Sequence, residues 1–167
     1  MTTFGIYEKA LPKGISWQER LELAASLGFD FVEMSIDETD ERLTRLQWTD
    51  QEIEAVNQAQ RSTGVRIYSI CLSGHRRYPF GSADPAKRQK ALEMMQECVD
   101  LAVKLGVRNI QLAGYDVYYE DKTVLSRELF IQNLDKAVKM AAAKQVMLSI
   151  EIMDDPFINS IEKYLAV

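Results

Sequence analysis

The chain has 167 residues, 47% hydrophobic and 27% charged, which suits a single globular domain over residues 1–167 and argues against disorder. Its 20 basic and 25 acidic residues are interspersed and give a net charge of −5, which disfavours nucleic acid and anionic membranes as partners. The first residues show no apolar signal segment and no stretch approaches the ~20 apolar residues of a membrane span, so a cytoplasmic protein is expected.

Five β-rich segments alternate with four helical segments along the chain. Strands are predicted near residues 4–8, 30–36, 66–73, 108–113 and 146–153. Helices are predicted near residues 16–27, 49–62, 84–105 and 124–144, the third with Asp84 as its N-cap and Pro85 in its first turn. This alternation predicts a parallel sheet, because parallel neighbours need a crossover connection.

The junction from helix to strand repeats along the chain. Gly28, Gly64 and Gly106 each close a helix directly before a strand, and Gln145 holds the same place in the fourth unit. Glycine suits this position because it adopts a left-handed backbone conformation without a steric penalty. The repeating unit is therefore a helix followed by a strand.

The predicted strands are apolar on one face and small or polar on the other. In the fifth strand Ile150 lies on the apolar face and Glu151 on the opposite one; in the third, Tyr68, Ile70 and Leu72 are predicted on the apolar face. A doubly wound sheet, the alternative, needs central strands that are apolar on both faces. The pattern favours an α/β fold in which about five parallel strands with outer helices form an incomplete TIM-type (β/α) barrel.

Side chains able to carry chemistry cluster where the predicted strands end, which is where barrels of this type place their active groups. The candidates are Tyr7, Glu8, Lys9, Glu33, Asp37, Glu38, His75, Arg76, Arg77, Tyr115, Asp116, Glu151, Asp154 and Asp155. His75 is the single histidine of the chain. Cys71 and Cys98 lack the spacing of a disulfide framework or a zinc site and are expected to be buried, reduced thiols.

A carboxylate in an apolar strand needs a partner, because burying an isolated charge costs several kcal/mol. For Glu151 the alternatives are an ion pair with a basic side chain, or a role as metal ligand or general base. Glu33 is expected to be a structural hydrogen-bond hub. His75 is expected on a loop, solvated or hydrogen-bonded, beside Arg76 and Arg77 as candidate anion contacts. The acidic run DETDER, residues 37–42, is expected to be a solvated loop.

Five segments in order carry a resemblance to a known family. GIYEKALP, LGFDFVEMSIDETDERLTRL, CLSGHRRYPFGS, IQLAGYDVYY and EIMDDPFINSI resemble the L-ribulose-5-phosphate/L-xylulose-5-phosphate 3-epimerases of bacterial ascorbate and pentose use, over essentially the whole chain. These epimerases are sugar isomerase and epimerase barrels similar to xylose isomerase. The resemblance implies an isomerase of carbohydrate metabolism that acts on a small-molecule ketopentose phosphate.

The resemblance also implies a metal and a mechanism. Such enzymes hold one divalent ion, Mn²⁺, Mg²⁺ or Zn²⁺, through a Glu, an Asp, a His and a Glu from strands five to eight. Glu151 matches the first ligand, which is also one of two carboxylates that move the proton at C3. The residues considered for substrate contact are Tyr7, Glu8, Lys9, His75, Arg76, Arg77 and Tyr115.

Strands six to eight of such a barrel have no counterpart in these 167 residues. The chain is therefore expected to be the amino-terminal part of a (β/α)8 barrel, to hold metal weakly and to show little activity alone. Two alternatives stay open. One is a non-catalytic half-barrel that associates with itself, as a homo-oligomer, or with a missing second half through exposed sheet edges. The other is a hexulose-6-phosphate isomerase-type enzyme on the same scaffold.

Overall fold

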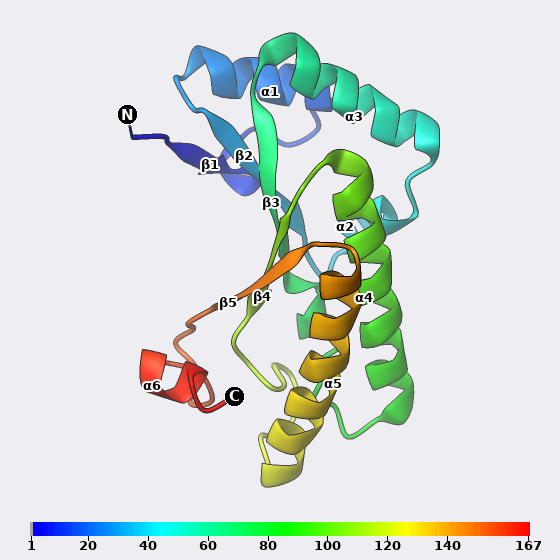
Figure 1. Ribbon diagram of the computed structural model, residues 1–167, viewed down its shortest axis with the longest axis vertical. Helices are drawn as coiled ribbons and strands as arrows, with labels where there is room; N and C mark the ends of the chain where they lie inside the picture. Colours follow the sequence, from blue (N-terminus) through cyan, green and yellow to red (C-terminus); the bar gives the residue numbers. More distant parts are fainter. Residues whose placement is uncertain (1) are drawn as a thin grey trace.

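A curved parallel sheet runs through the computed structural model, which describes residues 2–167 (Figure 1). Its five strands lie side by side in the order in which they occur in the chain, and each pairs in parallel with the next. They are β1 (Gly5–Tyr7), β2 (Phe31–Ile36), β3 (Arg66–Leu72), β4 (Asn109–Ala113) and β5 (Met147–Glu151). The predicted strands and their parallel pairing are confirmed.

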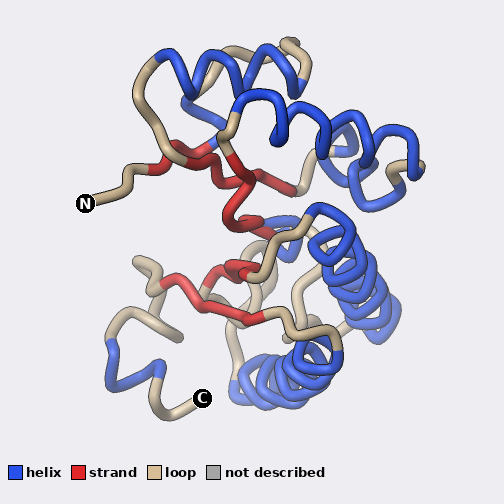
Figure 2. Tube along the Cα trace, turned by 45° about the horizontal axis from the view of Figure 1, so that its top comes forward, coloured by secondary structure: helices blue, strands red, loops and turns tan. Residues whose placement is uncertain are grey.

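Four long helices connect the strands and lie on the outside of the sheet (Figure 2). They are α1 (Trp17–Ser26), α3 (Asp50–Thr63), α4 (Pro85–Leu105) and α5 (Val124–Ala143). Short helical segments follow several strands: η1 (Glu8–Ala10), α2 (Asp40–Leu43), η2 (Thr44–Gln47), η3 (Ser73–Arg76) and α6 (Ile161–Tyr164). Consecutive parallel strands with helices on one side make an incomplete (β/α) barrel, as predicted. None of the helices within residues 2–167 combines the length and apolar character needed to cross a bilayer.

Local sequence signals set the ends of these helices. Asp84 caps α4, because its Oδ1 accepts a hydrogen bond of 2.8 Å from the backbone N–H of Ala86 while Pro85 occupies the first helical position. At the other ends of α3 and α4, Gly64 and Gly106 adopt φ of 74°. Gly28 and Gln145, one residue further from the ends of α1 and α5, also have positive φ, of 82° and 57°. The repeated helix–strand junction predicted from the glycines is therefore one backbone geometry, which a non-glycine residue adopts once.

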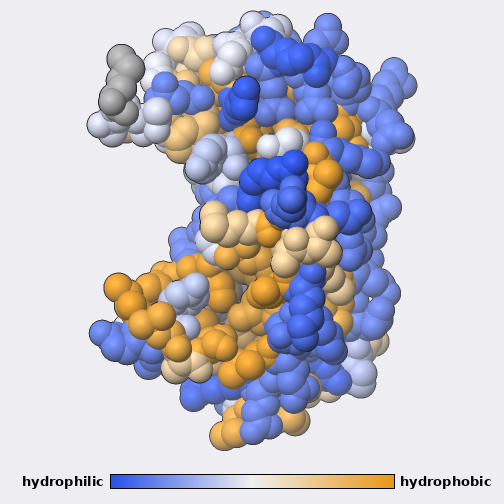
Figure 3. All heavy atoms as spheres, in the orientation of Figure 1, coloured by the Kyte–Doolittle hydropathy of each residue, from blue (hydrophilic) through white to orange (hydrophobic). Residues whose placement is uncertain are grey.

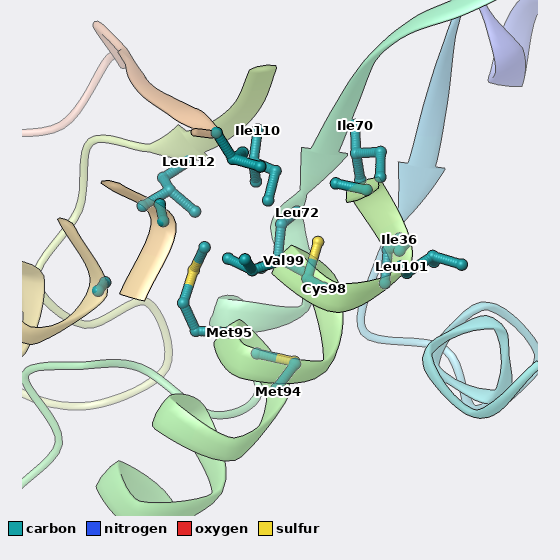
Figure 4. Close-up of a cluster of buried hydrophobic side chains, with 14 of the residues drawn as sticks. Ile36, Ile70, Leu72, Met94, Met95, Cys98, Val99, Leu101, Ile110 and Leu112 are labelled. Carbon is teal, nitrogen blue, oxygen red and sulfur yellow. The ribbon is translucent and has the colours of Figure 1, made fainter. Parts of the chain in front are cut away.

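The hydrophobic core lies between the sheet and the helices, chiefly α4 (Figure 4). The side chains that meet there are almost fully buried: Ile36, Ile70, Leu72, Met94, Met95, Cys98, Val99, Leu101, Ile110 and Leu112. Each such side chain contributes roughly 1.5–3 kcal/mol through removal of its apolar surface from water. Because this face of the sheet is filled, the opposite face alone is open for a ligand.

The predicted alternation fails at one position of the third strand. In the register of β2 with β3, Val32 pairs with Ile67 and Glu33 with Ser69, so Tyr68 is bulged out of the pairing. Tyr68 is 64% exposed and its ring stacks 5.0 Å from that of Phe31. The expectation that Tyr68 shares the apolar face is wrong, because the bulge inserts one residue and brings Ile67 to the core instead.

Candidate active site

A cavity of about 420 Å³ opens on the inner face of the sheet, near the carboxyl ends of the strands. Figure 3 shows the surface hollowed on one side, and Figure 1, in the same orientation, places α4 and α5 on the other side. The lining comes from all five strands or from the segments that follow them: Tyr7, Lys9, Glu33, Cys71, Ser73, Arg76, Gln111, Ala113, Glu151 and Met153. Of the residues proposed from sequence for substrate contact or catalysis, Tyr7, Lys9, Arg76 and Glu151 meet here.

Glu151 is the last residue of β5 and lies opposite Ala113 of β4 in the sheet. The backbone N–H of Gly114 donates a hydrogen bond of 3.0 Å to the Glu151 carbonyl, which holds the two strand ends together. The side chain is exposed and makes no ion pair within residues 2–167. The expectation of a buried carboxylate is wrong here, because the inner face is open, and the alternative of a basic partner is not met. Glu151 therefore presents a free carboxylate to the cavity.

Glu33 and Tyr7 form the opposite wall of the cavity. The Ser69 hydroxyl donates a hydrogen bond of 2.6 Å to Glu33 Oε2, a single bond rather than the hub expected from sequence. The Tyr7 hydroxyl donates to Ser35 Oγ at 3.0 Å. Burial raises the pKa of Tyr7, so its phenol stays protonated and remains a hydrogen-bond donor at neutral pH.

Cys71 lies on β3 at the floor of this cavity, between the two carboxylates. Burial raises the pKa of its thiol; a hydrogen bond with Tyr7 opposes this rise, and the negative charges of Glu33 and Glu151 add to it. The thiol is therefore protonated at neutral pH and makes an uncharged floor. Both cysteines are free thiols; Cys98 is buried in the core as expected, whereas Cys71 is only partly buried because it lines the cavity.

Two cations, Lys9 and Arg76, stand at the rim of the cavity, whereas Tyr115, which was considered for substrate contact, is not part of the lining. Lys9 Nζ lies 2.6 Å from Asp37 Oδ2. Arg76 lies over the ring of Tyr118, at 5.0 Å from its centroid, and its buried Nε has no hydrogen-bond partner among residues 2–167. Tyr115 is 3% exposed, and burial raises its pKa to about 12. The charge of Arg76 opposes this rise, so Tyr115 is a buried neighbour of Arg76 behind the cavity wall.

Glu8 does not reach the cavity, although sequence reasoning placed it among the substrate contacts. It is fully buried and accepts hydrogen bonds from Arg45 at 2.6 and 2.8 Å and from the Ser35 backbone N–H at 2.8 Å. Arg20 and Arg42 approach it to 3.2 and 3.0 Å. Burial opposes ionisation of Glu8, but the hydrogen bond and charge of Arg45 outweigh it and hold the pKa below its usual range. Glu8 is the structural hub that sequence reasoning assigned to Glu33.

His75 and Arg77 also lie away from the cavity. His75 is 7% exposed, stacks on Phe80 at 4.2 Å and places Nε2 3.4 Å from the Ala91 carbonyl. Of the two expectations for His75, solvated or hydrogen-bonded, the second is met, because η3 turns the side chain into the core. Burial lowers its pKa to about 4, so the imidazole is neutral at pH 7. Arg77 is exposed and pairs with Asp40 at 2.5 Å.

The acidic run after β2 is not the solvated loop that was expected. Asp37 is 7% exposed and pairs with both Lys9 and Arg42, at 2.6 and 3.4 Å. Thr39 caps α2, and Glu38 Oε1 accepts a hydrogen bond of 2.9 Å from Tyr119. Burial opposes ionisation of Asp37, but hydrogen bonds from Lys9 and Thr39 lower its pKa to about 2. The segment therefore braces the rim that carries Lys9.

Five further lining residues were not among the sequence candidates for chemistry: Cys71, Ser73, Gln111, Ala113 and Met153. The alternation of the strands does place such residues on the polar inner face, which is the signal that could have found them.

As for a metal, no group of three or more His, Cys, Asp or Glu side chains within residues 2–167 could hold an ion. Glu151 supplies one carboxylate donor, so these residues do not form a complete metal site.

Comparison with known proteins shows which family has this sequence and fold. The family description "Xylose isomerase-like TIM barrel" matches residues 21–167. The chain belongs to this family. SgbU of Escherichia coli (strain K12), provisionally named an L-ribulose-5-phosphate 3-epimerase, is 59% identical over 160 residues, which are 96% of this chain and 56% of SgbU. The L-ribulose-5-phosphate 3-epimerase UlaE of Escherichia coli O157:H7 (strain EC4115) is 55% identical over 161 residues, 96% of this chain and 57% of UlaE.

Solved structures agree on the xylose isomerase-like fold. A D-psicose 3-epimerase from Clostridium cellulolyticum H10, crystallised with D-tagatose, superposes with a TM-score of 0.78 at 20% identity, over 97% of this chain and 57% of that one. An L-ribulose 3-epimerase superposes with a TM-score of 0.73 at 24% identity, over 99% of this chain and 56% of that one. A xylose isomerase-like TIM barrel protein from Mycobacterium smegmatis in complex with magnesium superposes with a TM-score of 0.69 at 17% identity. The superposition covers 99% of this chain and 61% of that one. The chain spans little more than half the length of the relatives it matches.

Proposed function

We propose that this chain is the amino-terminal part of a (β/α)8 ketopentose-phosphate 3-epimerase acting on L-ribulose 5-phosphate or L-xylulose 5-phosphate. The observation that carries the proposal is Glu151, a free carboxylate at the carboxyl end of β5 inside the cavity. It occurs in a chain that is 55% identical over 161 residues to an L-ribulose-5-phosphate 3-epimerase. A carboxylate at this position is suited to accept a proton from a bound sugar.

The proposed reaction inverts C3 of the open-chain sugar. The C2 carbonyl acidifies the C3–H bond, so the Glu151 carboxylate accepts that proton while the electron pair of the broken bond moves onto the C2 oxygen. The product is a planar enediolate. Water on the opposite face of C3 then donates a proton to C3, which gives the epimer, and the resulting hydroxide takes the proton held by Glu151, which restores the starting protonation state. The described residues form no complete metal site, and Glu151 would supply one carboxylate donor to a divalent ion that polarises the C2 carbonyl.

The other lining residues suit a phosphorylated polyol. Arg76 offers an unused guanidinium Nε and is our candidate for the phosphate contact, with Lys9 as a second cation at the same rim. Tyr7, Glu33 and Gln111 provide donors and acceptors for sugar hydroxyls. Arg77, which faces Asp40 outside the cavity, is not part of this proposal.

The test follows the C3 proton directly. The protein is incubated with L-ribulose 5-phosphate in D₂O with added Mn²⁺, and loss of the C3–H signal is followed by NMR. We expect Glu151→Gln to lower the exchange rate at least about a hundredfold, since general-base groups contribute 10²–10⁴-fold. Glu41→Gln, which changes an exposed carboxylate outside the cavity, is the control. The wild-type rate is expected to be low, because the described residues form no complete metal site; equal exchange above the protein-free rate in wild type and Glu151→Gln would contradict the role of Glu151. The product sugars separate a 3-epimerase from a hexulose-phosphate isomerase.

A second candidate function rests on the sheet edges. β1 and β5 each have one neighbour, and exposed apolar side chains accompany them: Phe4, Met147, Ile152, Ile161 and Leu165. Figure 3 shows the hydrophobic surface gathered at the β5 and α6 end. An unpaired strand edge can form backbone hydrogen bonds with a strand of another chain, so we propose that the chain forms a homo-oligomer through these edges. Light scattering after size exclusion tests this; a clean monomer at high concentration would contradict it.

A further inference from the structure

A second cavity, of about 340 Å³, lies between the loop after β1 and the segment that contains α2 and η2. It shares Lys9 alone with the lining of the candidate active site. Five basic side chains line it, and we call it the basic cavity: Lys9, Lys13, Arg20, Arg42 and Arg45. The reaction proposed above does not use it.

The charges of the basic cavity do not balance. Two acidic residues, Asp37 and Glu41, share its lining, and Glu8 lies buried beneath the three arginines. Five positive and three negative groups leave about two positive charges uncompensated. The guanidinium groups of Arg20, Arg42 and Arg45 have side-chain exposures of 7%, 13% and 10%, so water compensates them poorly. A negative ligand would relieve this repulsion.

Arg20 gives an independent sign of an absent partner. Its Nη1 lies 3.2 Å from Glu8 and its Nη2 donates to the Ile15 carbonyl at 3.2 Å. Its Nε is buried and donates to no acceptor among residues 2–167. The Trp17 ring lies 5.2 Å from the guanidinium carbon and covers one side of the group. A buried N–H of a charged group without an acceptor costs about 1–3 kcal/mol, so the protein does not fully satisfy the guanidinium of Arg20, a residue that lines the basic cavity.

We propose that the basic cavity is a second anion site that binds a phosphate group, either free phosphate or a phosphate monoester. Phosphate carries between one and two negative charges at neutral pH, which matches the uncompensated charge, and its oxygens suit several guanidinium donors at once. Lys13, an exposed side chain at the rim, has no ion pair within the described residues and is available to close over the ligand.

Phosphate bound there would tie the loop after β1 to the α2 segment. Lys9 belongs to that loop and contacts Asp37 across it, so the ligand would brace the rim of the candidate active site without entering it. A ligand that binds only the folded chain raises its stability according to concentration and affinity. Stability is therefore a readout of this site that does not depend on catalysis.

The experiment measures the thermal midpoint of the full chain at pH 7 in a buffer without phosphate. Sodium phosphate is titrated against sodium chloride at equal ionic strength, and a saturable rise of the midpoint above the chloride series is expected. Lys13→Gln should raise the apparent Kd about threefold, as loss of one rim charge does. Arg20→Lys, which removes Nε, should abolish the rise. Lys139→Gln, which changes an exposed lysine on α5, is the matched control.

Two further arms identify the source and the location. D-ribose 5-phosphate replaces inorganic phosphate in one series; a tighter response identifies a monoester as the ligand, and a weaker one identifies free phosphate. Both series are repeated with Arg76→Gln, which removes the phosphate contact proposed for the candidate active site, and a saturable rise that depends on Lys13 and Arg20 should persist there. The proposal is overturned by an absence of any saturable rise over chloride. It is also overturned if Lys13→Gln keeps the wild-type response, or if Arg76→Gln abolishes it.

Discussion

Replacing Glu8 by glutamine should destabilise the fold more than any other change of a single charge. The carboxylate is fully buried and lies within 3.2 Å of three guanidinium groups, from Arg20, Arg42 and Arg45. Glutamine keeps the volume of the side chain but leaves these cations without a counter-charge. Removing one partner of a buried ion pair costs about 3–5 kcal/mol, a large part of the 5–15 kcal/mol that stabilises a typical domain.

Urea unfolding followed by circular dichroism, in a buffer without phosphate, measures this loss. We expect a lower midpoint for Glu8→Gln with an unchanged slope, which means lower stability and the same folded state. Glu41→Gln is the matched control, since Glu41 is exposed and makes no ion pair within the described residues. It should change the free energy of unfolding by less than about 0.5 kcal/mol.

The cause is tested by removing one of the cations as well. If repulsion among the arginines produces the loss, Glu8→Gln combined with Arg20→Met should be more stable than the sum of the single changes predicts. A loss below about 1 kcal/mol for Glu8→Gln, or strictly additive single changes, would refute the view that Glu8 neutralises this cluster.

Three other changes probe the core, the strand ends and the helix junction. Because burial lowers the pKa of His75 to about 4, the unfolded chain binds the proton first, and stability should fall by about 3 kcal/mol as the pH drops from 6.5 to 4. His75→Phe should flatten this dependence in urea titrations at several pH values; an equally steep profile would contradict it. An added Cβ at Gly114 would lie 2.6 Å from the Glu151 carbonyl oxygen, so Gly114→Ala should displace the end of β5. The rate of proton exchange at C3 of the sugar should then fall at least about tenfold. An unaltered exchange rate would argue against this coupling. Gln145→Gly should raise the free energy of unfolding by about 0.5–1 kcal/mol, because it removes a strained left-handed residue. The same change at Gln89, inside α4, should lower the free energy of unfolding by a similar amount. The midpoints of thermal unfolding of the two variants test both expectations.

Local patterns in the sequence were sufficient to predict the strands, the long helices and their order along the chain. The two-residue alternation of the strands and the glycines after the helices are properties of neighbouring residues, so they can be read without knowledge of the fold. They also placed Tyr7, Lys9, Arg76 and Glu151 at the ends of strands, where the cavity is found. The family resemblance of five ordered segments added what alternation cannot supply, a chemical role for Glu151.

Only the tertiary structure decided which charged side chains are buried and with whom. Glu8 meets Arg20, Arg42 and Arg45, which lie on α1 and in the segment after β2, and no local pattern records such long-range pairing. His75 is buried because η3 turns it onto Phe80. The sequence by itself thus determined the sheet, its helical cover and the positions that could carry chemistry. The packing of distant segments decided which of those positions face a cavity and which hold the fold together, because burial and ion pairing depend on neighbours in space.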